Sequence, residues 1–567
     1  MPVKRYFGIE KFKGLLLAAS FATVVEFLMG VSDSAVAGNL LGEQALASIN
    51  LLSSVMGVVT FFASLIGVGM GVNYALESGR CAPDRARQIF TQGLWTALGV
   101  GLMLVTALIF LREPFLAFMS PSPEIAEYAR RYWRFFVPSA LLEPCVILLV
   151  NVAMADGNSC LCFISYAAQL VVNLAVSLLA IRDLGVAGCA LGTVVANAVA
   201  AGVLSTHFLS KANSFALVRH FSLKDTGRIV SSSFGDASSF LCSAALFFFL
   251  NKFVISRYGS GMLPVLATVI VTIGLLEIFN GVGNALAPIV TVYSGERNYP
   301  AIRLMMRMGT KLALLEGAAL SALLLAFPGL VVRLVGIDDP ALAGDAHAAV
   351  RFVAAGLVAY SLAYLYNSYY VFVGHEGLSV AVTVLNGFVV PVGLVLLCGG
   401  RGAYGLWAAL AAAPVAALVL FGAFLLLRHG AARFPLLLPR DRDAKISMVD
   451  LALNDEEIVR ASEQVGEVLK AAGVKPTVAM RASLMTEEVF MAVKDRNGAR
   501  RVLGEVTLDL NDGVQLTLRD DGEIFDITDA DQKISSLRTY LVASVMETQA
   551  GRMNIVTTGF NRNVFRF

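Results

Sequence analysis

The chain has 567 residues, of which 57% are hydrophobic and only 15% charged, and its mean hydropathy is +0.71. This composition excludes a large soluble protein and predicts a multi-pass protein whose surroundings are a lipid bilayer. The formal net charge of +2 gives no electrostatic reason to expect nucleic acid as a partner.

Apolar segments occupy most of the first 428 residues. A membrane-spanning helix needs about 20 predominantly apolar residues, and by this rule the sequence predicts twelve spans. They lie at residues 14–37, 45–73, 89–111, 134–155, 159–180, 185–208, 231–256, 262–292, 309–334, 350–373, 378–399 and 402–427. An even number places both termini on one side. The connectors on that side hold more Lys and Arg than the opposite loops, so we expect cytoplasmic termini and an inner (plasma) membrane location.

The first predicted span carries two acids, Glu26 and Asp33. They are seven residues apart and therefore share one face of a helix. Charged groups at bilayer depth are costly and usually face a bundle interior or a water-filled cavity. The pair predicts a site that takes up and releases a proton or another cation. The alternative is a structural acid that neighbouring helices hold by hydrogen bonds.

Landmarks of the first half recur in the second half. The triplet GVG occurs at 67–69 and again at 281–283, and both copies are followed by a Ser-Gly pair, a proline and an arginine. The pattern predicts an all-α membrane region built from two six-helix lobes in a parallel repeat, residues 1–220 and 221–428. Transporters of this design usually bind substrate between the repeats.

Several polar and aromatic residues are candidates for a substrate cavity between the lobes. They are Glu277, Asn251, Tyr366 and Tyr369. The alternative for Glu277 is a glutamate that is hydrogen-bonded across helices. The alternative for the tyrosines is an interfacial aromatic belt. All five histidines fall at or beyond segment ends, and we expect them at the surface. We expect no catalytic residue, no metal ligand set and no P-loop, because none of the corresponding motifs is present.

The membrane region resembles the multidrug and toxic compound extrusion (MATE) transporters. Asp33-Ser-Ala-Val-Ala-Gly38 is similar to their first-helix signature, and Ala155-Asp-Gly-Asn158 to the loop after their fourth helix. The resemblance implies a cation-coupled antiporter that needs no cofactor for transport and expels small organic compounds. It also implies a coupling-ion site that contains Asp33 and Asn173. Ser177 stands where the family has a second acid, which favours protons over sodium.

A soluble region follows the last apolar segment. Residues 429–445 form a basic linker, and residues 446–567 have the composition of a soluble α+β domain. The sequence predicts helices at 451–473, 481–497 and 534–548 and a terminal strand at 556–567. It also predicts a hairpin that turns at Asn511-Asp512-Gly513.

The soluble region resembles the histidine-kinase-like ATPases, in particular their serine-kinase and anti-sigma-factor branch. Asp520 and Gly522 match the box that contacts adenine, and Glu488 matches the start of the helix that carries the magnesium ligand. Position 492, where that ligand is expected, is alanine. The resemblance therefore implies a degenerate, regulatory tail that binds ATP or ADP weakly and turns it over slowly or not at all. The tail is also a candidate docking site for a regulatory protein.

Two other functions stay open at this point. The first is a membrane sensor whose helices detect a ligand and whose tail signals to a partner. The second is a lipid or glycan flippase of the same superfamily, for which a cavity lined with Lys and Arg would be expected. The spans carry mostly acids, and this favours export of organic compounds.

Overall fold

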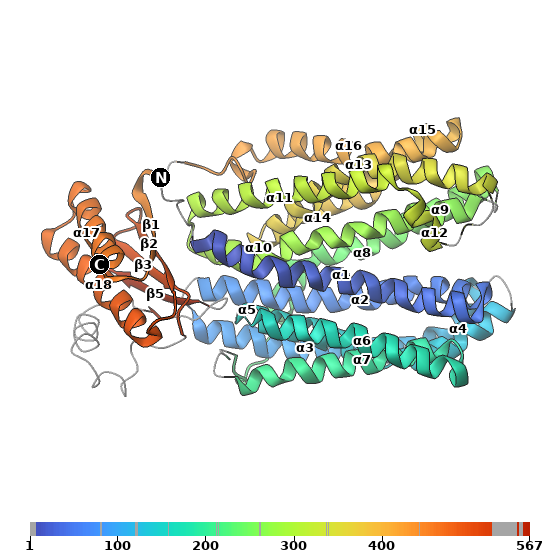
Figure 1. Ribbon diagram of the computed structural model, residues 1–567, viewed down its shortest axis with the longest axis horizontal. Helices are drawn as coiled ribbons and strands as arrows, with labels where there is room; N and C mark the ends of the chain where they lie inside the picture. The colour runs from blue at the N-terminus through green and yellow to red at the C-terminus, as the bar shows by residue number, and fades with distance from the viewer. Residues whose placement is uncertain are drawn as a thin grey trace.

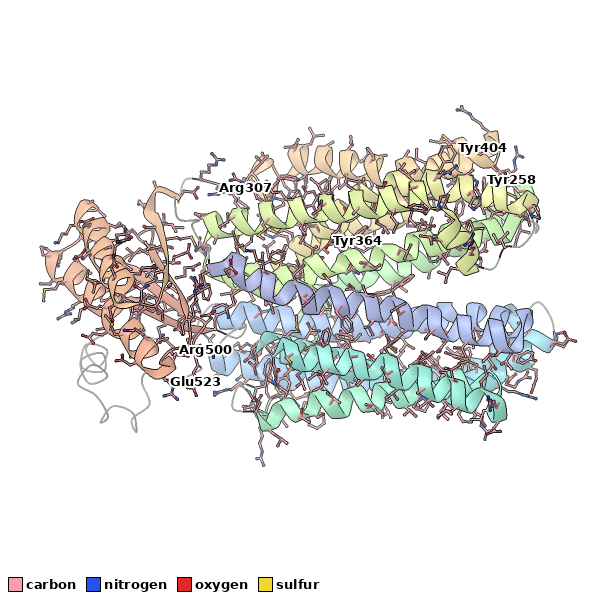
Figure 2. The ribbon with its side chains drawn as sticks, viewed as in Figure 1. Tyr258, Arg307, Tyr364, Tyr404, Arg500 and Glu523 are labelled. Atoms are coloured by element: carbon pink, nitrogen blue, oxygen red, sulfur yellow. The ribbon has the colours of Figure 1, made fainter. Side chains whose placement is uncertain are left out.

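The computed structural model describes residues 7–79, 82–119, 123–156, 158–210, 213, 215–259, 262–335, 337, 340–440, 443–523, 553–554 and 560–567. It shows an elongated helix bundle with a smaller α/β unit, the tail, at one end (Figure 1). Residue 7 and the tail lie at the same end of the bundle. We call this the tail end. The opposite, far end carries Tyr258 and Tyr404 (Figure 2).

Seven helices form the part of the bundle before the connector at 206–222. They are α1 (Phe7–Leu41), α2 (Glu43–Gly79), α3 (Pro83–Met119), α4 (Pro123–Phe136), α5 (Ser139–Ala155), α6 (Ser159–Leu184) and α7 (Ala187–Ser205). We call them the first half.

The second half contains the remaining helices of the bundle. They are α8 (Leu223–Tyr258), α9 (Leu263–Gly274), α10 (Asn280–Gly295), α11 (Tyr299–Ala326), α12 (Gly329–Val335), α13 (Pro340–Phe372), α14 (Glu376–Val384), α15 (Val390–Cys398) and α16 (Ala403–Arg428). A 3-10 turn, Leu275–Phe279, separates α9 from α10, and a π-turn, Leu385–Val389, joins α14 to α15.

Ten helices of the described residues are long and apolar enough to cross a membrane. The number rises to eleven if the bent pair α4 and α5 counts as one span, with an angle of 50° between its two parts. The predicted span at 262–292 is interrupted by the 3-10 turn, so neither α9 nor α10 alone is long enough to count. The chain is thus a multi-pass helical protein, and the number twelve stays a prediction.

Prolines account for two differences from the predicted boundaries. The predicted span 309–334 begins earlier, because Asn298 caps α11 and Pro300 occupies its first turn, and it ends at Ala326 before Pro328. The predicted span 134–155 is broken before Ser139, next to Pro138. His207, expected at the surface, is instead only 1% exposed, with Nε2 2.8 Å from Oδ2 of Asp156.

Among the described residues, the hydrophobic cores that the two halves share lie between the tail end and the middle of the bundle. One shared core joins Phe12, Leu15 and Val72 of the first half to residues of α10, α11 and α13. Another joins Phe61 and Leu65 to Ala237. At the far end, each half has a core of its own, one from α1–α7 and the other from α8–α16 and the short turns between them.

In its described residues, the tail is an antiparallel sheet with two helices against it. The strands are β1 (Ile446–Ala452), β2 (Leu503–Asp509), β3 (Gln515–Asp520), β4 (Met553–Asn554) and β5 (Asn561–Arg566), in the order β1-β2-β3-β5-β4. The helices are α17 (Asp455–Ala471) and α18 (Pro476–Asn497). An apolar core lies between helices and sheet.

Two features of the tail follow from local sequence. The predicted hairpin is confirmed, because β2 and β3 are joined through Gly513, whose φ of 104° suits glycine. The predicted helix at 451–473 begins later, at Asp455, because residues up to Ala452 pair as β1 and Asn454 caps the helix. The predicted helix at 534–548 lies outside the described residues.

Candidate functional site

The carboxylate of Asp33 is the centre of a hydrogen-bonded cluster inside the first half. Only 6% of this residue is exposed. Tyr132 of α4 donates its hydroxyl hydrogen to Oδ2 at 2.9 Å, and Thr193 of α7 donates to the same oxygen at 3.0 Å. Asn173 of α6 donates from Nδ2 to Oδ1 at 3.4 Å. Side chains from four helices therefore meet at one acidic group.

Asn173 is held by two further hydrogen bonds. Its Oδ1 accepts from the hydroxyl of Ser32 at 3.0 Å, and its Nδ2 also donates to Thr193 at 3.1 Å. The amide hydrogens are thereby directed towards Asp33 and Thr193. Each neighbour of the carboxylate presents a donor, and such bonds are strongest when the carboxylate is ionised.

Close contact of α6 and α7 depends on Gly192. A Cβ atom there would lie 2.2 Å from Oγ of Ser177 and 2.8 Å from the carbonyl oxygen of Asn173. Ser177 itself is 1% exposed, and its hydroxyl has no hydrogen-bond partner among the described residues. It therefore packs against α7, one turn away from the Asn173 amide that contacts Asp33. A glycine at 192 is what allows Asn173 and Thr193 to reach the same carboxylate.

The structure brings together Asp33 and Asn173, while Tyr366 and Tyr369 lie in another part of the bundle. Asn251 of α8 donates to the carbonyl oxygen of Phe247 in its own helix at 2.8 Å. Tyr366 and Tyr369 are buried in the shared core at the tail end. The side chains of Glu26 and Glu277 lie outside the described part of the structure.

Sequence reasoning missed two residues of the cluster, Tyr132 and Thr193. Tyr132 lies between the predicted spans at 89–111 and 134–155, where no helix was predicted. The buried residues of α4 (Ala129, Tyr132, Trp133 and Phe136) follow the spacing of one helix face, and that pattern would have predicted the helix. Thr193 follows the glycine that brings α7 against α6, and no motif distinguishes it.

A family model described as MatE matches residues 18–179 and 238–397, more than half of the chain. The chain belongs to the MatE family. Asp33, Tyr132 and Asn173 lie inside the first matched segment. The two matched segments are similar in length. The spacing between their first residues is close to the spacing between the two GVG triplets, which favours the predicted duplication.

Relatives of this MatE protein include a curated sequence and solved structures. The multidrug export protein MepA of Staphylococcus saprophyticus is 22% identical over 207 residues, which are 36% of this chain and 46% of MepA. A MOP superfamily transporter from Pyrococcus furiosus is 18% identical with a TM-score of 0.70, covering 75% of this chain and 96% of its own. An outward-facing multidrug resistance MATE family transporter is 19% identical with a TM-score of 0.68 and the same coverage. These structures share the fold of the MatE region.

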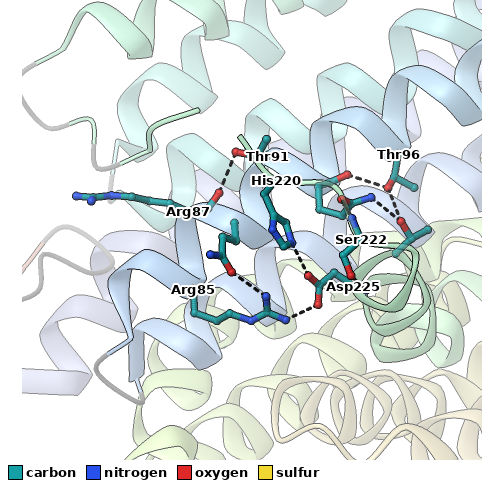
Figure 3. A network of polar contacts seen from close by, with 10 residues as sticks. Arg85, Arg87, Thr91, Thr96, His220, Ser222 and Asp225 are labelled. Atoms are coloured by element: carbon teal, nitrogen blue, oxygen red, sulfur yellow. Dashed lines mark hydrogen bonds and ion pairs between the residues drawn. The ribbon is translucent and has the colours of Figure 1, made fainter. Parts of the chain in front are cut away.

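A polar network anchors the connector between the halves of the MatE region to α3 (Figure 3). Arg85 pairs with Asp225, and Nε2 of His220 lies 2.6 Å from Oδ2 of the same carboxylate. Burial raises the pKa of Asp225, but the bonds from His220 and Arg85 outweigh burial and lower the pKa overall. Gln92 accepts from the backbone of Ser222 at 2.8 Å. The network explains how the connector is fixed, and we assign it a structural role.

The tail lies outside the family match, and its predicted nucleotide residues are only partly arranged for a ligand. Asp520 is fully buried, and its Oδ1 accepts from Nδ2 of Asn561 at 2.7 Å and from the backbone of Gly522 at 3.1 Å. Its Oδ2 has no partner among the described residues. Burial raises the pKa of Asp520 to about 6. Glu488 belongs to α18, and the likeness to ATPases stays a prediction.

Proposed function

We propose that the protein is a cation-coupled antiporter that exports organic compounds, with Asp33 as the coupling site. The observation that carries this proposal is the buried Asp33 cluster. A carboxylate that is buried inside a membrane protein without a paired cation is costly to ionise, so its charge state is sensitive to whether water or a cation reaches it. Names of relatives point the same way, since MepA is described as a multidrug export protein.

Alternating access accounts for transport in this proposal. Among the described residues, the halves share cores from the tail end to the middle of the bundle and have separate cores at the far end. This arrangement corresponds to a state that is closed at the tail end, and rocking of the halves would produce the opposite state. If the tail is cytoplasmic, as the distribution of Lys and Arg predicts, the described state faces outward.

Protons are the favoured coupling ion. Sodium is a hard cation that needs several oxygen acceptors, as other hard cations do. The neighbours of the Asp33 carboxylate act as donors towards it, and the predicted second acid is replaced by Ser177, which faces Gly192. A single carboxylate is sufficient to carry a proton. Glu26 stays a candidate second acid on the same helix, and Glu277 and Asn251 stay candidates for substrate contact.

Purified full-length protein in liposomes tests the proposal. Efflux of a cationic dye is followed under an imposed pH gradient without sodium, and separately under a sodium gradient at equal pH. The account predicts efflux under the pH gradient. Efflux that needs the sodium gradient would reverse the choice of ion, and absence of efflux of cationic, anionic and neutral dyes under both gradients would refute the antiporter.

We further propose that the tail binds an adenine nucleotide weakly. The buried, unpartnered Oδ2 of Asp520 fits the amine of an adenine base. The side chain of Ala492 offers no oxygen to a magnesium ion. Nucleotide hydrolysis should therefore be slow, because metal ions supply much of the charge stabilisation in phosphoryl transfer. Calorimetry of the full chain with ATP, alongside Asp520→Ala, tests this. No heat at millimolar nucleotide would refute it.

A further inference from the structure

The tail sheet buries a cluster of charges against the end of α10. Glu296, which follows the last residue of α10, pairs with Arg519 of β3 and with Arg562 of β5, whose Nε lies 2.6 Å from Oε1. The side chains of both arginines and of Glu296 are at most 4% exposed. One acid of the membrane region thus pairs with two cations of the tail.

A second acid completes this cluster from inside the tail. Glu505 of β2 pairs with Arg519, and its Oε2 accepts from the hydroxyl of Tyr293 at 2.8 Å. The guanidinium of Arg519 also lies 5.0 Å from the centre of the Tyr293 ring. The charges of two arginines and two glutamates therefore balance in a buried interface. Removal of one member would leave a buried charge uncompensated, which is strongly unfavourable.

The tail also contacts the first helix of the other half. The backbone nitrogen of Phe7 donates to Oδ1 of Asp450 at 2.9 Å, and its ring meets that of Phe560 edge-on at 5.5 Å. Nζ of Lys11 lies 3.7 Å from Asp521. Since α1 belongs to the first half and α10 to the second, the tail holds one element of each half.

These two elements lie against each other where the tail binds them. A Cβ atom at Gly8 of α1 would lie 3.1 Å from the Tyr293 hydroxyl of α10. Nearby, Arg228 of α8 pairs with Glu77 of α2 at 2.6 Å, so the halves are joined at this end by ion pairs as well as by shared cores. In the opposite transport state the halves part at this end, and one rigid tail would then lose its contacts with α1 or with α10.

We propose that the tail is a clamp that stabilises the state closed at the tail end, through the Glu296 cluster on α10 and the Phe7 and Lys11 contacts on α1. The inference rests on the proposed alternating access. A tail that binds one state better than the other shifts the equilibrium by its difference in affinity. Any event that withdraws the sheet from Glu296 then makes opening at the tail end easier and changes the rate of transport.

A distance measurement tests the clamp directly. Spin labels are placed on cysteines that replace the exposed residues Asp84 of α3 and Arg307 of α11, in the full chain with its native cysteines replaced. Glu296→Gln is compared with the parent and with Glu456→Gln, a control on α17 whose ion pair, among the described residues, is with Arg460 of the same helix. Lys11→Gln is a second variant that leaves the buried cluster intact.

We expect Glu296→Gln to increase at least threefold the population in which the two spin labels are far apart. Lys11→Gln should increase this population less, and the control should match the parent. Unchanged distances in Glu296→Gln and Lys11→Gln, or an equal change in the control, would overturn the clamp. The measurement needs neither substrate nor gradient. Its failure is therefore distinguishable from a failure of the proposed antiport, which dye efflux reports separately.

Discussion

Gly192→Ala should disturb the Asp33 cluster although residue 192 does not touch Asp33. The added Cβ would lie 2.2 Å from Oγ of Ser177, where ordinary contacts begin near 3.4 Å. The helices α6 and α7 must therefore separate by about 1 Å, and overpacking of this kind costs about 1–3 kcal/mol. The hydrogen bond from Asn173 of α6 to Thr193 of α7 is 3.1 Å long, so such a separation breaks it and loosens the two donors to Asp33.

Thermal unfolding and dye efflux measure these two effects of Gly192→Ala. We expect Tm to fall by at least about 2 °C and efflux to fall with it. Gly202→Ala on the same helix, α7, is the matched control, because a Cβ atom at position 202 meets nothing within 4 Å. The double variant with Ser177→Ala should recover part of the loss, since it removes the closest contact. Wild-type Tm and efflux in Gly192→Ala would refute the reasoning.

Two further predictions follow from single contacts. Tyr132→Phe removes one of the two donors to Oδ2 of Asp33 and should slow efflux by about tenfold or more, because a hydrogen bond to a charged group contributes about 1.5–3 kcal/mol and about 1.4 kcal/mol corresponds to a factor of ten. Tyr128→Phe on the same helix is the control, and equal rates for both would contradict the prediction. Burial raises the pKa of Asp450 from 3.8 to about 7, and the negative charge of Glu505 on the facing strand is the second largest cause. The folded tail therefore binds a proton more tightly than the unfolded chain, and stability is lost as the pH rises towards 7. Asp450→Asn should raise Tm more at pH 8 than at pH 5, and an equal change at both would contradict this.

The sequence predicted the membrane region because its signals are local. Apolar length alone identifies most spans, and the short motifs that begin at Asp33 and at Ala155 were sufficient for the family resemblance. The partners Tyr132 and Thr193 could not be identified in the same way. They come from α4 and α7, and only the packing of these helices against α1 shows that they reach the carboxylate.

The tail shows the same limit more strongly. The hairpin at Gly513 follows from its turn residues, and the helix predicted at 481–497 is present from Pro476 to Asn497, because the signals for both are local. By contrast, Glu296 has the appearance of an ordinary loop acid in the sequence. Its role depends on two arginines more than 200 positions later in the chain, which the sheet places side by side. Pairing between residues so far apart in the chain leaves no pattern that a single sequence shows.

Asp33→Asn in liposomes tests the central claim most directly. The amide keeps the size of the side chain and one acceptor oxygen but cannot exchange a proton. We predict folded protein with wild-type Tm to within a few degrees and no dye efflux under a pH gradient. Asp183→Asn, at an exposed position of α6 in the same half, should transport normally. Undiminished efflux by folded Asp33→Asn protein would contradict the assignment of Asp33 as the coupling site.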